Sequence, residues 1–245
     1  MSTRIRLDQA LEQRGLMPSR ARARDAILRG TVTVNGQIAS KPNQQVGQDD
    51  KLAIADPASS YVSRAALKLI AGLDAGEIAV EGKTCLDAGA STGGFTQVLM
   101  ERGAVRIYAV DVGHDQLHAR LRGSNRVISL EGQNVKELTP AIIPDAIDLL
   151  VCDISFVSIV KVLAPALGLC RPGADAVILI KPQFEVGREN IGKGGIVTDP
   201  EAVGVAVQAV LDFMAAQGFA HRLSVPSPIS GGDGNEETVA VFRKD

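Results

Sequence analysis

Four charged residues each follow a short apolar run in the sequence: Asp87, Asp111, Asp153 and Lys181. Apolar runs of this length, alternating with helical stretches, are typical of buried parallel strands. Ligands of such sheets bind outside the carboxyl ends of the strands, where these four side chains should meet. Any one of them alone is equally consistent with a solvated strand end or a helix cap. Together they predict a binding and catalytic site at one edge of a sheet.

The first of these residues opens a glycine-rich stretch, residues 87–95, with glycines at 89, 93 and 94. This spacing does not match the dinucleotide fingerprint, and the carboxylate of Asp87 would repel a pyrophosphate. A ligand with an ammonium group fits better. Asp111, one strand-helix-strand step further on, is placed to accept hydrogen bonds from ribose hydroxyls. An amine at one end and a ribose at the other describe S-adenosylmethionine.

The elements that must position these residues form an alternating α/β pattern. Strands are expected at residues 84–86, 106–110, 127–130, 148–152 and 176–180, and near 223 and 239, which predicts a doubly wound sheet with helices on both faces. Apolar residues at helical spacing predict two short helices before it, with Leu7 and Leu11 in the first and Ala23 and Ile27 in the second. Residues 31–38 then predict a hairpin with an Asn-Gly turn, and residues 51–54 a further strand.

Charge separates the chain into two parts. Residues 1–60 hold nine Lys and Arg against six Asp and Glu, whereas residues 61–245 hold 17 against 22. Seven arginines fall within the first thirty residues, and the planar guanidinium group suits phosphate, so an anionic partner is expected for this part. Residues 56–60 are rich in turn formers. We therefore predict a small α+β domain at residues 1–56, a linker at 57–62 and the α/β domain at 63–245.

Composition excludes several other classes. With 45% apolar and 22% charged residues, the chain is neither disordered nor fibrous. No apolar run approaches the roughly 20 residues of a membrane span, and no secretory signal is visible, so a cytoplasmic protein is expected. The three cysteines, Cys85, Cys152 and Cys170, each have apolar neighbours and are predicted to be reduced core thiols. The three histidines lack ligand spacing with them, so no metal site is predicted.

The sequence resembles the TlyA family of rRNA 2′-O-ribose methyltransferases, often labelled hemolysin A. The similar segments are residues 61–69, 87–95, 111–113, 134–135, 153–156, 181–185 and 192–200. The family joins an RNA-binding module, named after ribosomal protein S4, to a methyltransferase domain related to FtsJ. The resemblance therefore implies a Rossmann-like class I methyltransferase sheet preceded by a small RNA-binding domain, with S-adenosylmethionine as cofactor and ribosomal RNA or ribosomal subunits as partner. Cytidine is the nucleoside that it implies.

The resemblance also implies a catalytic tetrad of Lys68, Asp153, Lys181 and Glu237, with Lys181 as the base. A ribose hydroxyl is a poor acid, so its proton needs a nearby acceptor. A second ammonium at Lys68 and removal from water would both favour an uncharged lysine, whereas Asp153 opposes this and must not simply pair with the base. Glu237 is the weakest assignment, because Glu236 is adjacent and Thr238 replaces the usual large apolar residue. Ala65 and Ala66 also depart from the pair of small residues, often two glycines, that the family has before the first lysine.

Binding residues follow from the motifs and from the basic residues of the first domain. Predicted cofactor contacts are Asp87, Gly89, Ala90, Ser91, Gly93, Gly94, Phe95, Asp111, Val112, Asn134 and Asp153. Predicted RNA contacts are Arg4, Arg6, Arg20, Arg22, Arg24 and Lys41. An ideal helix points Arg20 and Arg24 one way and Arg22 and Arg29 roughly the other, so not all of these arginines can meet one phosphate backbone.

Two other functions stay open at this stage. The chain could bind RNA or the ribosome without catalysis, or, as the family's label invites, act on membranes as a hemolysin. The glycine-rich residues 192–195 are expected to form either a lid over the substrate or a plain surface loop. The sequence does not fix the modified nucleotide or the oligomeric state.

Overall fold

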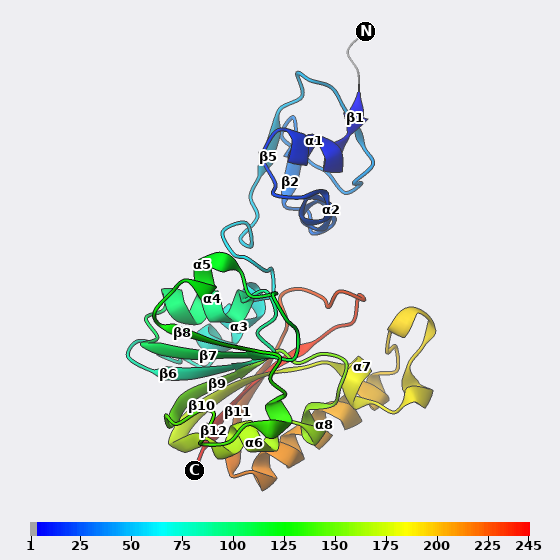
Figure 1. Ribbon diagram of the computed structural model, residues 1–245. Coiled ribbons are helices and arrows are strands. Elements are labelled where there is room, and N and C mark those ends of the chain that lie inside the picture. Colours follow the sequence, from blue (N-terminus) through cyan, green and yellow to red (C-terminus); the bar gives the residue numbers. More distant parts are fainter. Residues whose placement is uncertain (1–3) are drawn as a thin grey trace. The chain divides into compact units, whose positions relative to one another are not determined.

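The structure is a computed structural model that describes residues 4–245, apart from the side chain of Arg188, and the chain divides between Ser60 and Tyr61 into two units (Figure 1). This division falls inside the predicted linker.

The smaller unit contains the two predicted helices and the predicted hairpin. The helices are α1 (Leu7–Gln13) and α2 (Arg20–Leu28), and Ser19 caps α2 by accepting a hydrogen bond from the Arg22 amide. One sheet has the order β3-β2-β5, formed by Gln37–Ile38, Val32–Val34 and Leu52–Ile54. A second sheet pairs β1 (Ile5–Arg6) with β4 (Gln45–Val46), two strands that the sequence analysis missed. The apolar stripes of both helices are buried against β2 and β4.

The larger unit is built on a seven-stranded sheet with the order β11-β12-β10-β9-β6-β7-β8. Its strands are β6 (Thr84–Ala88), β7 (Arg106–Asp111), β8 (Val127–Glu131), β9 (Ile147–Cys152), β10 (Cys170–Ile180), β11 (Phe219–Pro226) and β12 (Thr238–Lys244). Five neighbouring strands, β10, β9, β6, β7 and β8, are parallel to one another. Strand β12 lies between β10 and β11 and is antiparallel to both. The residues after β9 and β10 and the residue before β12 therefore reach the same edge of the sheet.

Helices cover both faces of this sheet, as predicted (Figure 1). One face carries α3 (Ala66–Ala75), α4 (Gly94–Glu101) and α5 (Ala119–Arg122). The other carries α6 (Ala164–Gly168) and α8 (Pro200–Ala216). The short helix α7 (Pro182–Glu185) follows β10, and single 3₁₀ turns occur at Val135–Glu137, Ile159–Lys161, Arg188–Asn190 and Lys193–Gly195. Each face has its own buried cluster of mainly aliphatic side chains, which fixes the sheet edge that carries the site.

Candidate active site

The glycine-rich stretch after β6 passes very close to the end of β9. Gly89 has φ +87°, and a Cβ at this position would lie 3.0 Å from the carbonyl carbon and oxygen of Asp153. A glycine is therefore required both by the backbone conformation and by the close approach. Ser91, two residues further on, also has a positive φ, and its amide donates to Asp111 Oδ2 at 2.8 Å. Asp111 Oδ1 accepts a second hydrogen bond, 2.7 Å long, from the Gly113 amide.

A cavity of about 350 Å³ opens beside this stretch, between the ends of β6, β7 and β9. Six predicted cofactor residues line it: Gly89, Ser91, Asp111, Val112, Asn134 and Asp153. A smaller adjoining cavity of about 150 Å³ is lined by further predicted residues, Ala90, Gly94 and Phe95. Other lining residues of the larger cavity were not predicted as cofactor contacts, among them Gln116, Ile154 and Val162; Ile154 lies in the segment after β9, whose motif was a usable signal. A pocket of this size with a few directed polar groups suits one small ligand.

Asp87 differs from its prediction. It is fully buried within β6, lines neither cavity, and accepts a 2.6 Å hydrogen bond from the Thr96 hydroxyl, while its Oδ1 has no hydrogen-bond partner among the described residues. Burial raises the pKa of this carboxyl to about 7. Thr96 belongs to α4, so this hydrogen bond links β6 to α4, the two elements on either side of the glycine stretch. Its position is that of a support behind the cavity rather than of a ligand contact.

Lys68 and Glu237 form an ion pair that is closed off from solvent. Lys68 lies in the first turn of α3, Glu237 directly precedes β12, and the ammonium donates a hydrogen bond to Glu237 Oε2. The two residues are only 6% and 5% exposed, whereas Glu236 is exposed to solvent. Of the two candidate glutamates, the structure therefore brings Glu237 to the lysine.

Lys181 lies where β10 ends and is also buried, with 6% of its surface exposed. Its ammonium donates to Ser155 Oγ at 2.7 Å, to the Ile154 carbonyl at 3.0 Å and to the Asp153 carbonyl at 3.2 Å. The Asp153 carboxylate oxygen Oδ1 is 2.6 Å from the same nitrogen. This contact is an ion pair without hydrogen-bond geometry, since Oδ1 receives no directed hydrogen bond.

This arrangement corrects the expectation that Asp153 stays apart from the base. The segment after β9 passes beside the end of β10, where Lys181 lies. The Lys181 ammonium therefore contacts the nearest acceptors of that segment, which are the Asp153 carboxylate and two carbonyls. Each lysine thus has a carboxylate of its own, Lys68 with Glu237 and Lys181 with Asp153.

All four residues of the predicted tetrad line one cavity of about 270 Å³. Asp153, Ser155 and Phe156 line both this cavity and the 350 Å³ cavity, so they form the border between the two. Phe156 is 91% exposed, and the centroid of its ring lies 5.5 Å from that of Phe184. Its φ of +68° is an unfavourable backbone conformation for a bulky residue. Glu185 holds this segment by accepting hydrogen bonds from Ser158 Oγ and the Ile159 amide.

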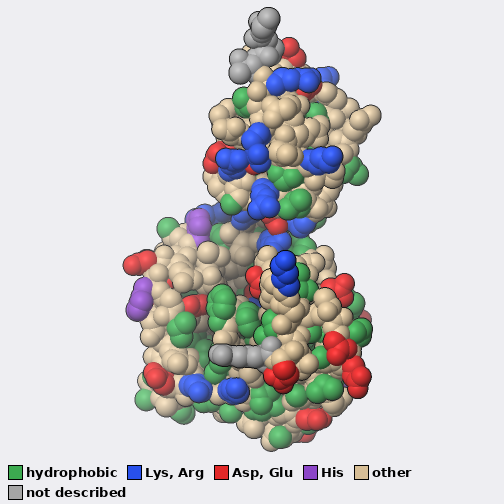
Figure 2. Space-filling model, turned by 90° about the vertical axis from the view of Figure 1, so that its right-hand side faces the viewer, with side chains coloured by type: hydrophobic (Ala, Val, Ile, Leu, Met, Phe, Trp, Pro, Cys, Tyr) green, Lys and Arg blue, Asp and Glu red, His purple; other side chains and the backbone are tan. Residues whose placement is uncertain are grey.

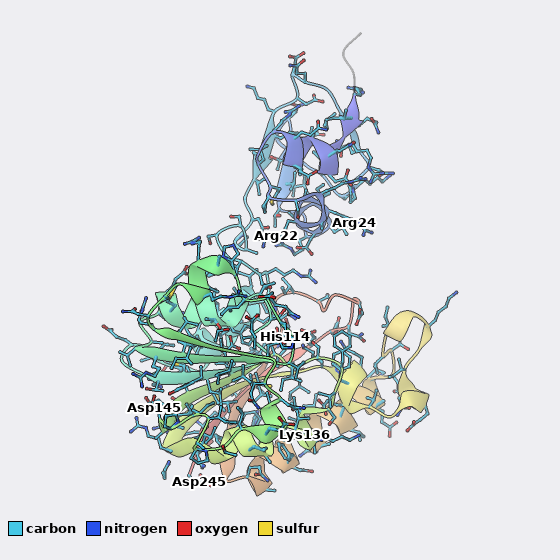
Figure 3. The ribbon with its side chains drawn as sticks, viewed as in Figure 1. Arg22, Arg24, His114, Lys136, Asp145 and Asp245 are labelled. Atoms are coloured by element: carbon cyan, nitrogen blue, oxygen red, sulfur yellow. The ribbon has the colours of Figure 1, made fainter. Side chains whose placement is uncertain are left out.

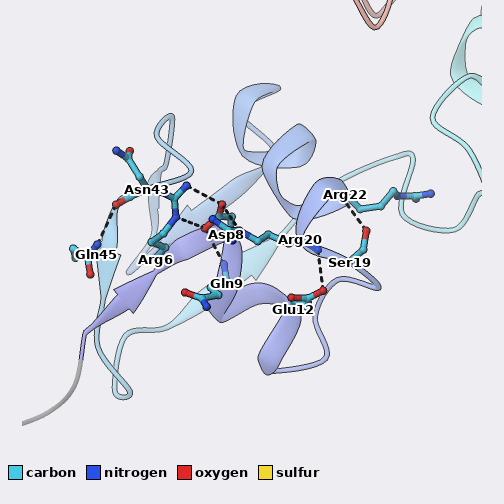
Figure 4. Close-up of polar contacts among 9 residues, drawn as sticks. All are labelled: Arg6, Asp8, Gln9, Glu12, Ser19, Arg20, Arg22, Asn43 and Gln45. Carbon is cyan, nitrogen blue, oxygen red and sulfur yellow. Dashed lines mark hydrogen bonds and ion pairs between the residues drawn. The ribbon is translucent and has the colours of Figure 1, made fainter.

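In the smaller unit, two of the predicted RNA-binding arginines are bound to one carboxylate (Figure 4). Asp8, at the start of α1, accepts 3.0 Å hydrogen bonds from Arg6 and from Arg20 of α2. The hydrogen bonds from these guanidinium groups, that from Arg6 first, lower the pKa of Asp8 to about 2. The side chains of Arg6 and Arg20 keep 40% and 49% of their surface exposed, so part of their charge is neutralised and part faces solvent.

The other predicted RNA contacts differ in environment. Arg22 donates to the Ala58 carbonyl at 3.0 Å, whereas Arg4, Arg24 and Lys41 are exposed. Arg24 projects from α2 (Figure 3), and Lys and Arg side chains are spread over the face of the smaller unit seen in Figure 2. Arg29 is held by Asp25 and Asp56. The arginines of α2 thus divide between structural ion pairs and solvent, and their RNA contacts stay predictions.

The remaining expectations concern cysteines, metals and membranes. Cys85, Cys152 and Cys170 are buried and unpaired, as predicted, and burial raises the pKa of each thiol to about 12. Among residues 4–245, no group of His, Cys, Asp and Glu side chains is arranged to hold a metal ion. Within the same range, no helix has the length and apolar character needed to cross a bilayer.

Comparison with known protein families explains this geometry. The FtsJ-like methyltransferase signature matches residues 61–244, and the S4 domain signature matches residues 5–52. The chain belongs to the FtsJ-like methyltransferase family. Membership confirms the predicted methyltransferase and its cofactor, S-adenosylmethionine, and the glycine stretch, Asp111 and the 350 Å³ cavity fit that cofactor. In the FtsJ-like domain, the strand order with an antiparallel β12 confirms the predicted class I sheet.

Several relatives share nearly the whole of this FtsJ-like chain. A Mycobacterium tuberculosis protein, 16S/23S rRNA (cytidine-2′-O)-methyltransferase TlyA, is 44% identical over 99% of this chain and 91% of its own length. Hemolysin A of Brachyspira hyodysenteriae is 39% identical over 97% and 99%. A solved structure of a Streptococcus thermophilus protein with a hemolysin name has 35% identity and a TM-score of 0.77, covering 100% of this chain and 90% of that one.

Proposed function

We propose that this enzyme methylates a ribose 2′-hydroxyl of cytidine in ribosomal RNA, with Lys181 as the base and the S4 domain binding the RNA. The observation that carries the proposal is that Lys68, Asp153, Lys181 and Glu237 line one cavity, which shares Asp153, Ser155 and Phe156 with the cofactor cavity. The activity named for the 44% identical relative supports the substrate class. A ribosomal RNA substrate also agrees with a cytoplasmic location.

The cofactor is expected in the 350 Å³ cavity, held by the glycine stretch, Asp111 and Asn134. When bound, S-adenosylmethionine supplies a methyl group on a positively charged sulfur. Asp111 already orders the Ser91 and Gly113 amides, so it keeps the rim of this cavity in place for a ribose. Asp153 faces both cavities, so it is placed to orient groups on either side of the border.

Lys181 takes the proton of the ribose hydroxyl in this proposal. In the structure its ammonium is surrounded by Ser155 Oγ, two carbonyls and Asp153. To act as a base it must first release one proton to water in the open cavity, and the entering hydroxyl must then replace one of these partners. Ser155 is the natural position for this exchange, because it is exposed to the cavity and its hydroxyl is 2.7 Å from Nζ. Lys68 lines the same cavity as the cationic half of its ion pair with Glu237.

The S4 domain is proposed to bind RNA mainly through phosphates. Arg4, Arg24 and Lys41 are exposed, and Arg6 and Arg20 are half exposed beside Asp8. Binding of this kind releases counterions, so the affinity should fall steeply as salt rises. A flat salt dependence would contradict this part of the proposal.

The decisive experiment is transfer of tritiated methyl from S-adenosylmethionine to ribosomal subunits or rRNA, followed by mapping of the methylated ribose. We expect transfer by the wild type and loss of at least about 1,000-fold in Lys181→Ala, with cofactor affinity within about twofold. Lys161→Ala, at an exposed lysine outside the three cavities, is the matched control and should keep full activity. Retained activity in Lys181→Ala would refute the base assignment. Binding of RNA without transfer by the wild type would favour the non-catalytic alternative.

A further inference from the structure

A buried asparagine joins the glycine-rich loop, residues 192–197, to the segment that carries Glu237. Asn235 is 2% exposed, although it lies in a loop. Its Oδ1 accepts a 2.9 Å hydrogen bond from the Val197 amide, and its Nδ2 donates a 2.9 Å hydrogen bond to the Gly195 carbonyl. The oxygen and the nitrogen of the side-chain amide thus both bind the backbone of another loop. A buried amide needs such hydrogen-bond partners, because an unpaired polar group is costly away from water.

The backbone around Asn235 also sets the position of Glu237. The Asn235 carbonyl accepts from the Gly231 amide at 2.9 Å, and the Gly231 carbonyl accepts from the Gly234 amide at 3.1 Å, which closes a turn. A Cβ on Gly231 would lie 2.7 Å from Glu237 Oε1, so the carboxylate rests directly on this turn. Gly232, Asp233 and Glu237 line the cavity with the two lysines.

The loop that Asn235 holds has little packing of its own. Its 3₁₀ turn, Lys193–Gly195, contains no buried residue, and Gly194 and Gly195 both have positive φ. Its own backbone hydrogen bonds, from the Gly192 amide to Ile196 O and from the Gly195 amide to Gly192 O, close the loop on itself. The two hydrogen bonds to Asn235 therefore tie this turn to the wall of the proposed substrate cavity.

Lys193 gives the loop a chemical purpose. It is exposed and lies in the 3₁₀ turn of this loop, which Asn235 fixes to a segment that borders the cavity where a ribose is proposed to enter. Every ribose in an RNA strand has a phosphate on either side, and a lysine near the target is a phosphate contact that positions the strand.

We propose that Asn235 is a positioning residue that fastens the glycine-rich loop so that Lys193 meets an RNA phosphate, and that fixes the turn under Glu237. This inference rests on the proposed function for its RNA contact. The fastening itself does not depend on that function. Asn235 then positions both the lysine that binds the RNA strand and the Lys68–Glu237 ion pair.

The first test needs no RNA. Trypsin binds an extended backbone, so cleavage after Lys193 should be faster when the loop leaves its turn, and the cleavage rate measures the fastening. We expect Asn235→Ala to raise this rate about tenfold, which is the size expected for removing two ordinary hydrogen bonds. Asn235→Asp keeps the acceptor for the Val197 amide but sets a buried carboxylate oxygen against the Gly195 carbonyl, so it should raise the rate at least as much as Asn235→Ala. Asn190→Ala, at an exposed asparagine of the preceding turn, is the control and should leave the rate unchanged.

The second test is a split of the kinetic constants for methyl transfer to RNA. Asn235→Ala and Lys193→Ala should each raise KM for RNA about tenfold with cofactor affinity within about twofold, and the double variant should fall well short of the product of the two effects. A folded Asn235→Ala with wild-type cleavage overturns the fastening. Raised cleavage with unchanged KM overturns the RNA contact. If Asn235→Ala does not fold, Asn235→Asp carries both tests. If the wild type transfers no methyl, the proposed function fails while the cleavage result still decides the fastening.

Discussion

Lys68 and Glu237, 169 positions apart in the chain, meet as a buried ion pair between the first turn of α3 and the start of β12. Both side chains are almost completely removed from water, at 8% and 2% exposure. A charge in such a place is tolerated only beside its partner, because the attraction between the two offsets the cost of desolvation. The pair therefore links α3 to β12, and both of its residues also line the 270 Å³ cavity.

Breaking one half of this pair should destabilise the protein more than replacing both. We expect Glu237→Gln or Lys68→Met to lower the free energy of unfolding by about 3 kcal/mol, and the double variant to lose less than either single variant. Denaturant unfolding measures this. Methyl transfer should be abolished in all three variants, whereas Glu236→Gln, at the exposed neighbour, should change stability by less than about 0.5 kcal/mol and keep activity. Strict additivity of the two single effects would show that the ion pair contributes nothing.

Asp87 makes stability depend on pH. Burial raises its pKa to about 7, so the folded protein holds a proton there that the unfolded chain releases near pH 4. The free energy of unfolding should fall as pH rises from about 4 to about 7 and be constant above. Asp87→Asn removes this dependence and should stabilise the protein at pH 8, by up to about 4 kcal/mol, but not at pH 4. Melting temperatures across this pH range measure it, and a wild type and variant with parallel profiles would contradict the assignment.

Asp111 should affect cofactor binding more than turnover. Its carboxylate orders the Ser91 and Gly113 amides at the rim of the 350 Å³ cavity. We expect Asp111→Ala to weaken the binding of S-adenosylmethionine about tenfold or more, with little change in kcat once the cofactor is saturating. Calorimetry gives the affinity. The control is Asp115→Ala, because the Asp115 side chain is 92% exposed and lines neither the 350 Å³ cavity nor the 150 Å³ cavity. Equal weakening in both variants would indicate a general charge effect instead of a local one.

The basic residues of the S4 domain should fall into two classes. Arg24→Ala and Lys41→Ala should weaken RNA binding, and each should reduce the slope of log affinity against log salt by about one, because one fewer phosphate is neutralised. Arg6→Ala should also destabilise this domain, because Asp8 is buried and its depressed pKa reports bonds to Arg6 and Arg20. The stability that Asp8 contributes is present above pH 4 and disappears as pH falls toward its folded pKa of about 2. Unfolding of wild type and variant between pH 2 and 6 checks this, and a variant that affects only RNA affinity would contradict it.

Much of the site was predictable because strand ends are visible in sequence. Asp111, Asp153 and Lys181 each follow an apolar run, and parallel strands bring such residues to one edge. The partner of Lys68 was not predictable in the same way: Glu236 and Glu237 differ only in which one turns inward, and that depends on the turn at Gly231 and Asn235. The pairing of Lys181 with Asp153 also depends on the path of the segment after β9, which carries no periodic signal.

In the smaller domain, the helices were predictable from their apolar stripes, but the fate of their arginines was not. Asp8 and Arg20 are twelve residues apart on different helices, so their ion pair depends on how α1 and α2 pack. The strands β1 and β4 are too short for any alternation to show.

The insertion of β12 between β10 and β11 has a consequence for synthesis on the ribosome. A nascent chain that has emerged as far as α8 already contains the cofactor loops and Lys181, yet the position next to β10 stays open until β12 arrives. Glu237 enters with that strand, and Lys68 has no counter-charge before then. Under the proposed mechanism, a chain that is still short of β12 therefore lacks one of the four residues of its substrate cavity.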